Sequence, residues 1–405
     1  MNKIETLDQL LSQLLPELVN VRRHLHRHPE LSHQESHTTE LIEHTLRKQG
    51  ITRISRPTST GLWADLGSGS GPMIAMRVVI DALPIQEENE CSYRSLRRGV
   101  MHGRGHDGHV AILIGVGLAL KTIEPLLPGT VRLIFQPAED TGTGAMKMIE
   151  SGVLGTPEVS EIFTFQLWPG LRQGQIASRP DAIMAGNSQV RIQIKGKAGH
   201  SAFPYEAIDA IVVAVQVISA LQTVVSRQSD PMKPVLFSIG TLQAGTSPFT
   251  IAETVEMMGT LRTFNFSVRD RALAQIERQI NQVTGAFGAQ GRLEVTHGSP
   301  PIVNAPQCVE RIRRATFATR AGEFLPLKAP VMFAEDFSRY LLHCPGSFIF
   351  VGINGPDGNE ANPLHSSCFD FDEAVFVPAI WTMLGIVADF FNLDFTSAER
   401  SDTQV

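Results

Sequence analysis

Residues 101–140, MHGRGHDGHVAILIGVGLALKTIEPLLPGTVRLIFQPAED, contain the pattern that decides the fold. A glycine-rich loop leads into the apolar run 109–123, which is long enough to form a buried helix. A second apolar run begins at residue 130 and leads directly into two acids, Glu139 and Asp140. A short apolar run of this kind is typical of a strand buried on both faces. The stretch therefore predicts a loop, a helix and a strand, the alternation found in α/β proteins.

Other apolar runs extend this pattern along the chain. The run MIAMRVVI (73–80) ends at Asp81, EIFTFQLWP (161–169) contains the polar Gln166, and FIFVGI (348–353) is a further candidate strand. Strands that alternate with helices predict a mostly parallel sheet, and ligands in such sheets bind beyond the carboxyl ends of the strands. The acids and Gln166 are therefore expected to lie near one binding site.

The character of the sequence changes near residue 185. Residues 188–200 alternate like a half-exposed strand, and a helix, two strands and a second helix are expected by residue 286. This order suggests a small α+β sandwich, and α/β character returns after it. We predict a discontinuous α/β domain, residues 1–184 and 296–405, with an inserted domain, residues 185–295.

Composition excludes several classes of protein. The 405 residues carry a formal net charge of -6, which gives no general attraction to nucleic acid or to anionic membranes. No uninterrupted apolar run approaches the ~18 residues that span a bilayer, and the first residues lack a signal-peptide pattern. The four cysteines show no metal or redox spacing. These features predict a reduced, cytoplasmic protein.

The loop at residues 101–109 resembles a metal-binding loop but contains Arg104. Histidine and aspartate are good ligands, whereas a guanidinium is always charged and has no lone pair to offer. A unit positive charge that faces a divalent ion at ~4 Å experiences about 8 kcal/mol of repulsion at an effective dielectric near 20. Either Arg104 swings outward, or it supplies the positive charge itself by pairing with Glu139 or Asp140.

Taken together, the motifs resemble the M20 family of metallopeptidases and amidohydrolases, in its aminoacylase, hippurate hydrolase and auxin-conjugate hydrolase branch. The resemblance covers nearly the whole chain and rests on eight segments in the family's order. They are RRHLHRHPELS (22–32), DALPI (81–85), MHGRGHDGH (101–109), VRLIFQPAED (131–140), GKAGHSAFP (196–204), GTLRTF (259–264), AEDFSRY (334–340) and PLHSSCFDFDE (363–373). The resemblance implies a metal-binding α/β domain with an inserted domain that forms a homodimer.

The resemblance also implies a two-ion site, from which this chain departs. The family's bridging cysteine corresponds to Arg104, and a histidine at the end of the next strand corresponds to Gln166. The second glutamate of a Glu-Glu pair corresponds to the shorter Asp140. Two ligand histidines are kept as His106 and His365. We therefore expect His106, Asp140 and His365 to hold at most one ion, zinc or another divalent cation, and a site with no ion is also compatible with the sequence.

The remaining site residues are assigned by the same resemblance. Glu139 matches the general base, and His200 matches a histidine of the inserted domain that helps to polarise the scissile carbonyl. Arg262 matches an arginine that binds a substrate carboxylate. We expect Arg104 to act with Glu139 and His200 in catalysis, and Gln166 and Glu335 to contact the substrate with Arg262. Glu335 has an alternative role as a helix cap.

Three functions are compatible with this pattern. The first is an amidohydrolase that acts on the amide bond of a small N-acyl amino acid or a related amide, through a degenerate metal site. The second is a metal-independent acyl-transfer or amide-forming enzyme on the same fold. The third is a non-catalytic ligand-binding homologue. The retention of Glu139, His200 and Arg262 favours an enzyme over a protein that only binds a ligand.

Overall fold

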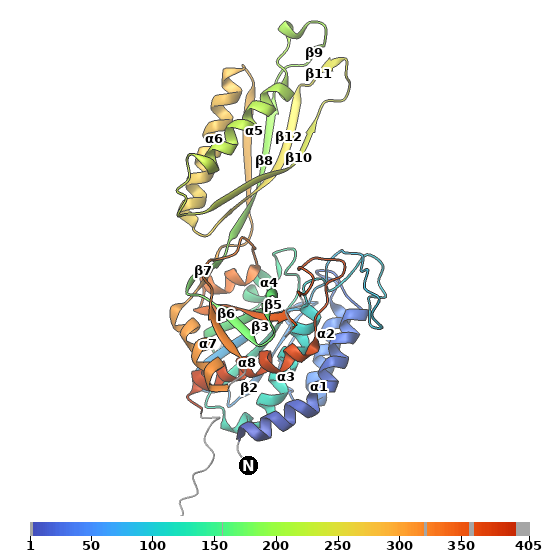
Figure 1. Ribbon diagram of the computed structural model, residues 1–405, viewed down its shortest axis with the longest axis vertical. Coiled ribbons are helices and arrows are strands. Elements are labelled where there is room, and N and C mark those ends of the chain that lie inside the picture. The colour runs from blue at the N-terminus through green and yellow to red at the C-terminus, as the bar shows by residue number, and fades with distance from the viewer. Residues whose placement is uncertain (1–2, 156, 320–321, 356–359, 394–405) are drawn as a thin grey trace, which may run out of the picture. The chain divides into compact units, whose positions relative to one another are not determined.

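The computed structural model describes residues 3–155, 157–319, 322–355 and 360–393. The chain divides into two compact units (Figure 1). Unit 1 contains residues 1–181, 303–328 and 339–405, and unit 2 contains residues 182–302 and 329–338. The predicted inserted domain, residues 185–295, lies within unit 2.

Unit 1 is built on an eight-stranded sheet with the strand order β1-β2-β4-β3-β5-β16-β6-β15. Its strands are β1 (Ile54–Ser55), β2 (Leu62–Gly67), β3 (Met73–Val79), β4 (Thr130–Gln136), β5 (Val159–Arg172), β6 (Gln175–Ser178), β15 (Glu323–Pro326) and β16 (Gly346–Asn354). The pairs β3–β4, β3–β5, β5–β16 and β6–β15 are parallel, and the pairs β1–β2, β2–β4 and β6–β16 are antiparallel. The predicted fold class, an α/β protein with a mostly parallel sheet, is confirmed.

Helices cover the buried strands of this sheet. All positions of β3, β4 and β16 are buried, as the continuous apolar runs predicted. The helices of unit 1 are α1 (Lys3–Arg27), α2 (Ser36–Lys48), α3 (His106–Thr122), α4 (Gly144–Glu150), α7 (Pro306–Thr319) and α8 (Phe376–Phe391). Short 3-10 turns lie at η1 (Glu124–Leu126), η3 (Asp336–Leu342) and η4 (Glu373–Val375).

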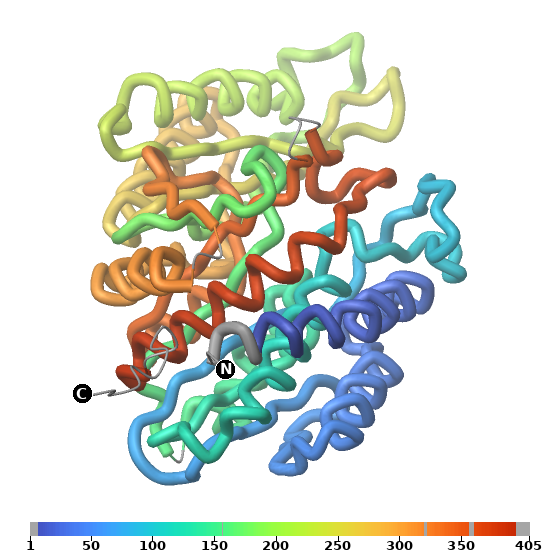
Figure 2. The backbone as a smooth tube through the Cα atoms, turned by 60° about the horizontal axis from the view of Figure 1, so that its bottom comes forward, coloured from blue at the N-terminus to red at the C-terminus, as the bar shows by residue number. Residues whose placement is uncertain are grey.

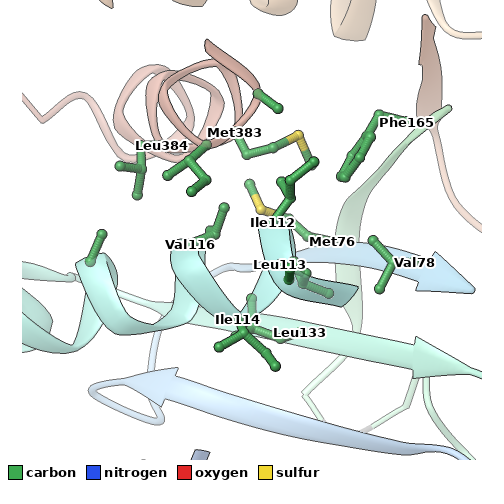
Figure 3. Close-up of a cluster of buried hydrophobic side chains, with 14 of the residues drawn as sticks. Met76, Val78, Ile112, Leu113, Ile114, Val116, Leu133, Phe165, Met383 and Leu384 are labelled. Carbon is green, nitrogen blue, oxygen red and sulfur yellow. The ribbon is translucent and has the colours of Figure 1, made fainter. Parts of the chain in front are cut away.

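Helix α3 is at the centre of the hydrophobic core. It packs against α1, α2, α8 and strand β3. Figure 3 shows Ile112 and Val116 of α3 between the sheet residue Met76 and the α8 residues Met383 and Leu384. Burial of such side chains contributes about 1.5–3 kcal/mol each. The core therefore fixes the N-terminus of α3, from which the glycine-rich loop extends.

The two ends of unit 1 lie together. Helix α8 approaches α1 near the start of α1 (Figure 2), where Nε1 of Trp381 donates a hydrogen bond of 2.9 Å to Oδ1 of Asp8. The segment Glu373–Phe391 is long and apolar enough to cross a membrane by length and composition, but 72% of its most apolar window is buried inside the structure. We therefore interpret this segment, which includes α8, as a core element. Asp372 caps the short turn η4, and α8 begins at Phe376.

Unit 2 contains a four-stranded antiparallel sheet in the order β10-β12-β8-β13. Its strands are β8 (Gly186–Lys195), β10 (Val235–Ala244), β12 (Thr254–Thr263) and β13 (Gln290–His297), and its helices are α5 (Ala210–Ser226) and α6 (Phe266–Ala286). The two helices and the sheet share one apolar core. Strand β13 was missed by the sequence analysis because it buries no residue fully.

Smaller elements complete the structure. Strands β9 (Gly199–His200) and β11 (Thr250–Ile251) form a two-stranded sheet, and the 3-10 turn η2 (Pro204–Glu206) lies between β9 and α5. The chain passes between the two units through β7 (Asp181–Met184) and β14 (Ile302–Asn304).

Candidate active site

The glycine-rich loop is attached to the loop that carries His365. The main-chain N–H of His365 donates to the carbonyl of Gly103 at 2.8 Å. Gly105 precedes α3 with φ of 80°, a left-handed conformation that glycine adopts without strain. His365 itself has φ of 68°. Two segments about 260 residues apart in sequence are therefore held together at the amino end of α3.

Asp81 orients His106. Nδ1 of His106 donates to the main-chain carbonyl of Asp81 at 2.7 Å and lies 3.3 Å from its Oδ1. Nε2 of His106 is buried and has no hydrogen-bond partner among the described residues. A histidine whose Nδ1 is held in this way presents the lone pair of Nε2, as ligand histidines do. Among the predicted ligands, His106 is thus the one oriented for coordination.

The side-chain carboxylate of Asp81 is fully buried. Its Oδ2 accepts hydrogen bonds from Ser32 Oγ at 2.8 Å and from the N–H of Asp140 at 2.9 Å. Burial would raise the pKa of Asp81, but the hydrogen bonds and charge of His106, with those from Asp140 and Ser32, lower it to about 2. Asp81 therefore stays ionised and joins the two strand ends of β3 and β4.

Arg104 forms an ion pair with Glu139. Nη1 of Arg104 donates to Oε2 of Glu139, and both side chains are almost completely buried. Of the two partners considered from the sequence, Glu139 is the one that Arg104 contacts. A carboxylate and a guanidinium placed together in this way provide a proton acceptor beside a hydrogen-bond donor of fixed charge.

Gln166 supports the main chain of Arg104. Its Nε2 donates to the carbonyl oxygen of Arg104 at 2.8 Å and to that of Leu167 at 3.2 Å. Gln166 lies on β5 and is buried. The amide nitrogen at the end of this strand is thus directed toward the backbone of the glycine-rich loop.

Glu35 holds the turn that carries Glu139 through a hydrogen bond to its main chain. Ala138 has φ of 53°, and its N–H donates to Oε1 of Glu35 at 2.8 Å. Burial raises the pKa of Glu35 to about 7, against the opposing effect of backbone hydrogen bonds. Asp140 is exposed, whereas Glu139 points into the protein. The neighbouring acids therefore have different environments.

His365 is close enough to Arg104 to be affected by its charge. Burial lowers the pKa of His365, and the positive charge of Arg104 lowers it further. The six predicted residues Arg104, His106, Glu139, Asp140, Gln166 and His365 all belong to unit 1, where Gln166 lies on β5, His106 begins α3 and the other four lie on loops.

The other three predicted residues belong to unit 2. His200 is exposed on β9, and its Nδ1 accepts a hydrogen bond of 3.1 Å from the N–H of Ala202. Arg262 lies on β12 and donates from Nη1 to the carbonyl of Met332 at 2.7 Å. Glu335 is buried, and its Oε2 accepts from the N–H of Phe337 at 2.9 Å. This last bond is the capping role considered from the sequence.

A buried ionic cluster behind α3 was missed by the sequence analysis. Oδ2 of Asp107 accepts from Nε of Arg22 at 3.0 Å and lies 2.9 Å from Nδ1 of His26. Nε2 of His26 lies 3.0 Å from Glu87, and Arg22 also pairs with Asp370 and Glu373. The cluster joins α1 to the start of α3 and to the segments that carry Glu87 and Asp370. The run RRHLHRH, rich in charge on an amphipathic helix, was the available signal.

A buried carboxylate at the end of a parallel strand, with a cation beside it and an oriented histidine nearby, is an arrangement that a hydrolytic site in an α/β fold can use. The chain belongs to peptidase family M20/M25/M40, which matches residues 75–389. It is therefore an enzyme of this family.

Named relatives agree with this assignment. The chain is 37% identical over 370 residues to an N-acetyl-L-cysteine deacetylase of Bacillus subtilis, covering 91% of this chain and 87% of the relative. It is also 37% identical over 302 residues to an N-acyl-L-amino acid amidohydrolase of Geobacillus stearothermophilus, covering 74% and 81%. The crystal structure of the YXEP protein of Bacillus subtilis, described as a dinuclear metal binding peptidase from the M20 family, superposes with a TM-score of 0.82. It is 33% identical and covers 94% of this chain and 99% of that one.

Proposed function

We propose that this enzyme hydrolyses the amide bond of a small N-acyl amino acid or a closely related amide. The observation that carries the proposal is the buried Glu139 at the end of β4, held beside the guanidinium of Arg104. The names of the deacetylase and amidohydrolase relatives support an acylated amino acid as the class of substrate. Because these relatives are hydrolases, acyl transfer and ligand binding without catalysis are not proposed.

Glu139 is the proposed general base that activates water. Arg104 and His200 are proposed to stabilise the oxyanion that develops on the scissile carbonyl, because both can donate hydrogen bonds. Arg262 is proposed to bind the carboxylate of the amino acid, a role that suits a planar guanidinium. Gln166 and Glu335 are proposed to complete the substrate site. For Glu335 this would be in addition to its capping bond.

The proposed metal content is lower than a dinuclear family member would have. His106, Asp140 and His365 are the side chains able to offer ligand atoms, and we propose that they hold at most one zinc or other divalent cation. The orientation of His106 supports a ligand role for that residue. Such an ion would supply Lewis-acid character when bound.

The association of two chains and the location of the enzyme in the cell are also proposals. Residues 185–295 are proposed to form the lid through which two chains associate, and exposed apolar residues of α5 such as Ile211, Val212 and Val215 are compatible with a covered surface. The composition supports a cytoplasmic location, with no nucleic acid or membrane as partner.

The proposal is tested with a panel of N-acetyl, N-benzoyl and longer N-acyl amino acids, with release of the free amino acid as the measurement. We expect turnover of at least one class and its abolition by Glu139→Gln. The matched control is Glu158→Gln, which changes an exposed glutamate away from the site. Turnover that is unchanged in Glu139→Gln would remove Glu139 from the mechanism, and no turnover of any member would refute the proposed substrate class.

A further inference from the structure

We infer that the guanidinium of Arg104 permanently replaces a metal ion beside Glu139, so that this chain works without a dinuclear centre. The chemical consequence rests on the proposed hydrolase function. The metal content and the ion pair, by contrast, are properties of the protein that can be measured without any substrate.

The first support is the position of the charge. The side chains of Arg104 and Glu139 are only 10% and 4% exposed, and they form an ion pair with each other. A guanidinium cannot lose its proton in a protein, so its charge remains when a metal ion approaches. Repulsion between the two cations is weakly screened in a buried place. Removal of Arg104 would also take away the positive charge that faces Glu139.

The second support is that Arg104 and Gln166 act as one unit. The amide of Gln166 donates to the main-chain carbonyl of Arg104 at 2.8 Å, and Arg104 in turn donates to Glu139. Gln166 therefore fixes the loop from which the guanidinium extends. Two of the three residues at which this chain departs from the ligand set that the resemblance implies are thus joined by a hydrogen bond.

The third support is the donor set that remains. Ligand atoms around one zinc ion lie about 2.0–2.2 Å from it, so any two of them are at most about 4.4 Å apart. Within the described part of the chain, His106, Asp140 and His365 do not form a group whose ligand atoms all lie within 4.8 Å of one another. One well-oriented nitrogen, Nε2 of His106, is not sufficient for a tight site.

The chemistry can proceed with these groups. Glu139 accepts a proton from water while the water oxygen bonds to the amide carbon, and the carbonyl electrons move to the oxygen, where Arg104 donates to the oxyanion. The carbonyl then forms again as the C–N bond breaks. The proton on Glu139 passes to the leaving amine, which gives a carboxylic acid and an amine without any further reactant.

The first test measures the metal content of the protein. Full-length protein is purified without chelator, and its zinc, manganese, iron and cobalt contents are measured by mass spectrometry. We expect no more than one ion per chain, even after incubation with excess Zn²⁺ or Mn²⁺. Two ions per chain would overturn the inference. If the metal measurements hold but no acyl amino acid is turned over, the proposed substrate class is wrong. The inference that Arg104 replaces a metal ion is then unaffected.

Chemical rescue is the second test, and it separates the charge of Arg104 from a purely structural role. Arg104→Ala leaves a cavity beside Glu139, and we expect millimolar guanidinium to raise the melting temperature of this variant by occupying it. The matched control is Arg98→Ala, which removes an exposed arginine of the same region. An identical guanidinium response in both variants would contradict the inference. If Arg104→Ala does not fold, the metal content of the unmodified protein tests the inference by itself.

Discussion

His26 and Asp107 form a buried hydrogen bond of 2.9 Å between Nδ1 and Oδ2, although 81 residues separate them in the chain. Glu87 lies 3.0 Å from the other ring nitrogen of His26. Burial alone would lower the pKa of His26, but the hydrogen bonds from its ring to Asp107 and Glu87 raise it to about 9. The imidazolium is therefore part of the structure next to His106.

The stability that His26 contributes should depend on pH. Its folded pKa of about 9 lies above the ordinary 6.5, so the contribution is fully present below pH 6.5 and is lost as pH rises toward 9. We expect His26→Asn to lower the free energy of unfolding by on the order of 3 kcal/mol at pH 6 and by much less at pH 9. Urea unfolding at the two pH values measures this difference.

The control for this change is His24→Asn, at an exposed position on the same helix. It should leave the free energy of unfolding within about 0.5 kcal/mol at both pH values. A loss in His26→Asn that is equal at pH 6 and pH 9 would show that the imidazole is neutral in the cluster.

Ionisation of Glu35 should make the stability of the protein depend on pH. Burial raises its folded pKa from 4.5 to about 7, so its contribution is present below pH 4.5 and is lost as pH rises through 7. Glu35→Gln keeps an oxygen for the N–H of Ala138 and removes the buried charge. We expect this variant to be more stable than the unmodified protein by on the order of 1–3 kcal/mol at pH 8, with little difference at pH 4.5. Urea unfolding of both proteins, with exposed Glu40→Gln as the control, tests this; lower stability of Glu35→Gln at pH 8 would refute it.

Gly144 should tolerate no side chain. A Cβ at this position would lie 1.7 Å from the carbonyl oxygen of Pro137 and 2.8 Å from Nε2 of Gln136, just before Glu139. We expect Gly144→Ala to cost about 1–3 kcal/mol in unfolding free energy and to reduce turnover by moving the Glu139 turn. Gly285→Ala is the control, because a Cβ there has no neighbour within 4 Å and should stabilise α6 by about 0.5–1 kcal/mol. A neutral Gly144→Ala would show that the turn can relax freely.

The double variant Arg104→Cys with Gln166→His should bind metal better than the unmodified protein. It removes the fixed cation and adds a thiolate and an imidazole, both of which are good ligands. We expect a stoichiometric ion in the purified double variant, measured by mass spectrometry, and little metal with either change alone. If the double variant stays free of metal, Arg104 and Gln166 are not what keeps ions out.

Sequence patterns predicted the parts of this structure that depend on local order. Continuous apolar runs identified β3, β4 and β16, and the strand ends gave Asp81 and Glu139. Helical periodicity identified α5 and α6 in unit 2 because each buries one face in its core.

Long-range polar contacts could not be predicted in the same way. Arg22 and His26 are completely buried by partners that lie 61–351 residues away, and no periodicity links them. The bond from Gln166 to the carbonyl of Arg104 depends on the path of the loop backbone. For Arg104 itself, charge alone left two acids as partners, and only the fold distinguished Glu139 from Asp140.

The place of β16 in the sheet has a consequence for biosynthesis. This strand comes late in the chain, yet it lies between β5 and β6, and the loop after it bears His365. The ribosome must deliver almost the entire polypeptide before the middle of the sheet can close. A nascent chain interrupted before residue 346 would expose the unfilled edge of β5 and would lack His365.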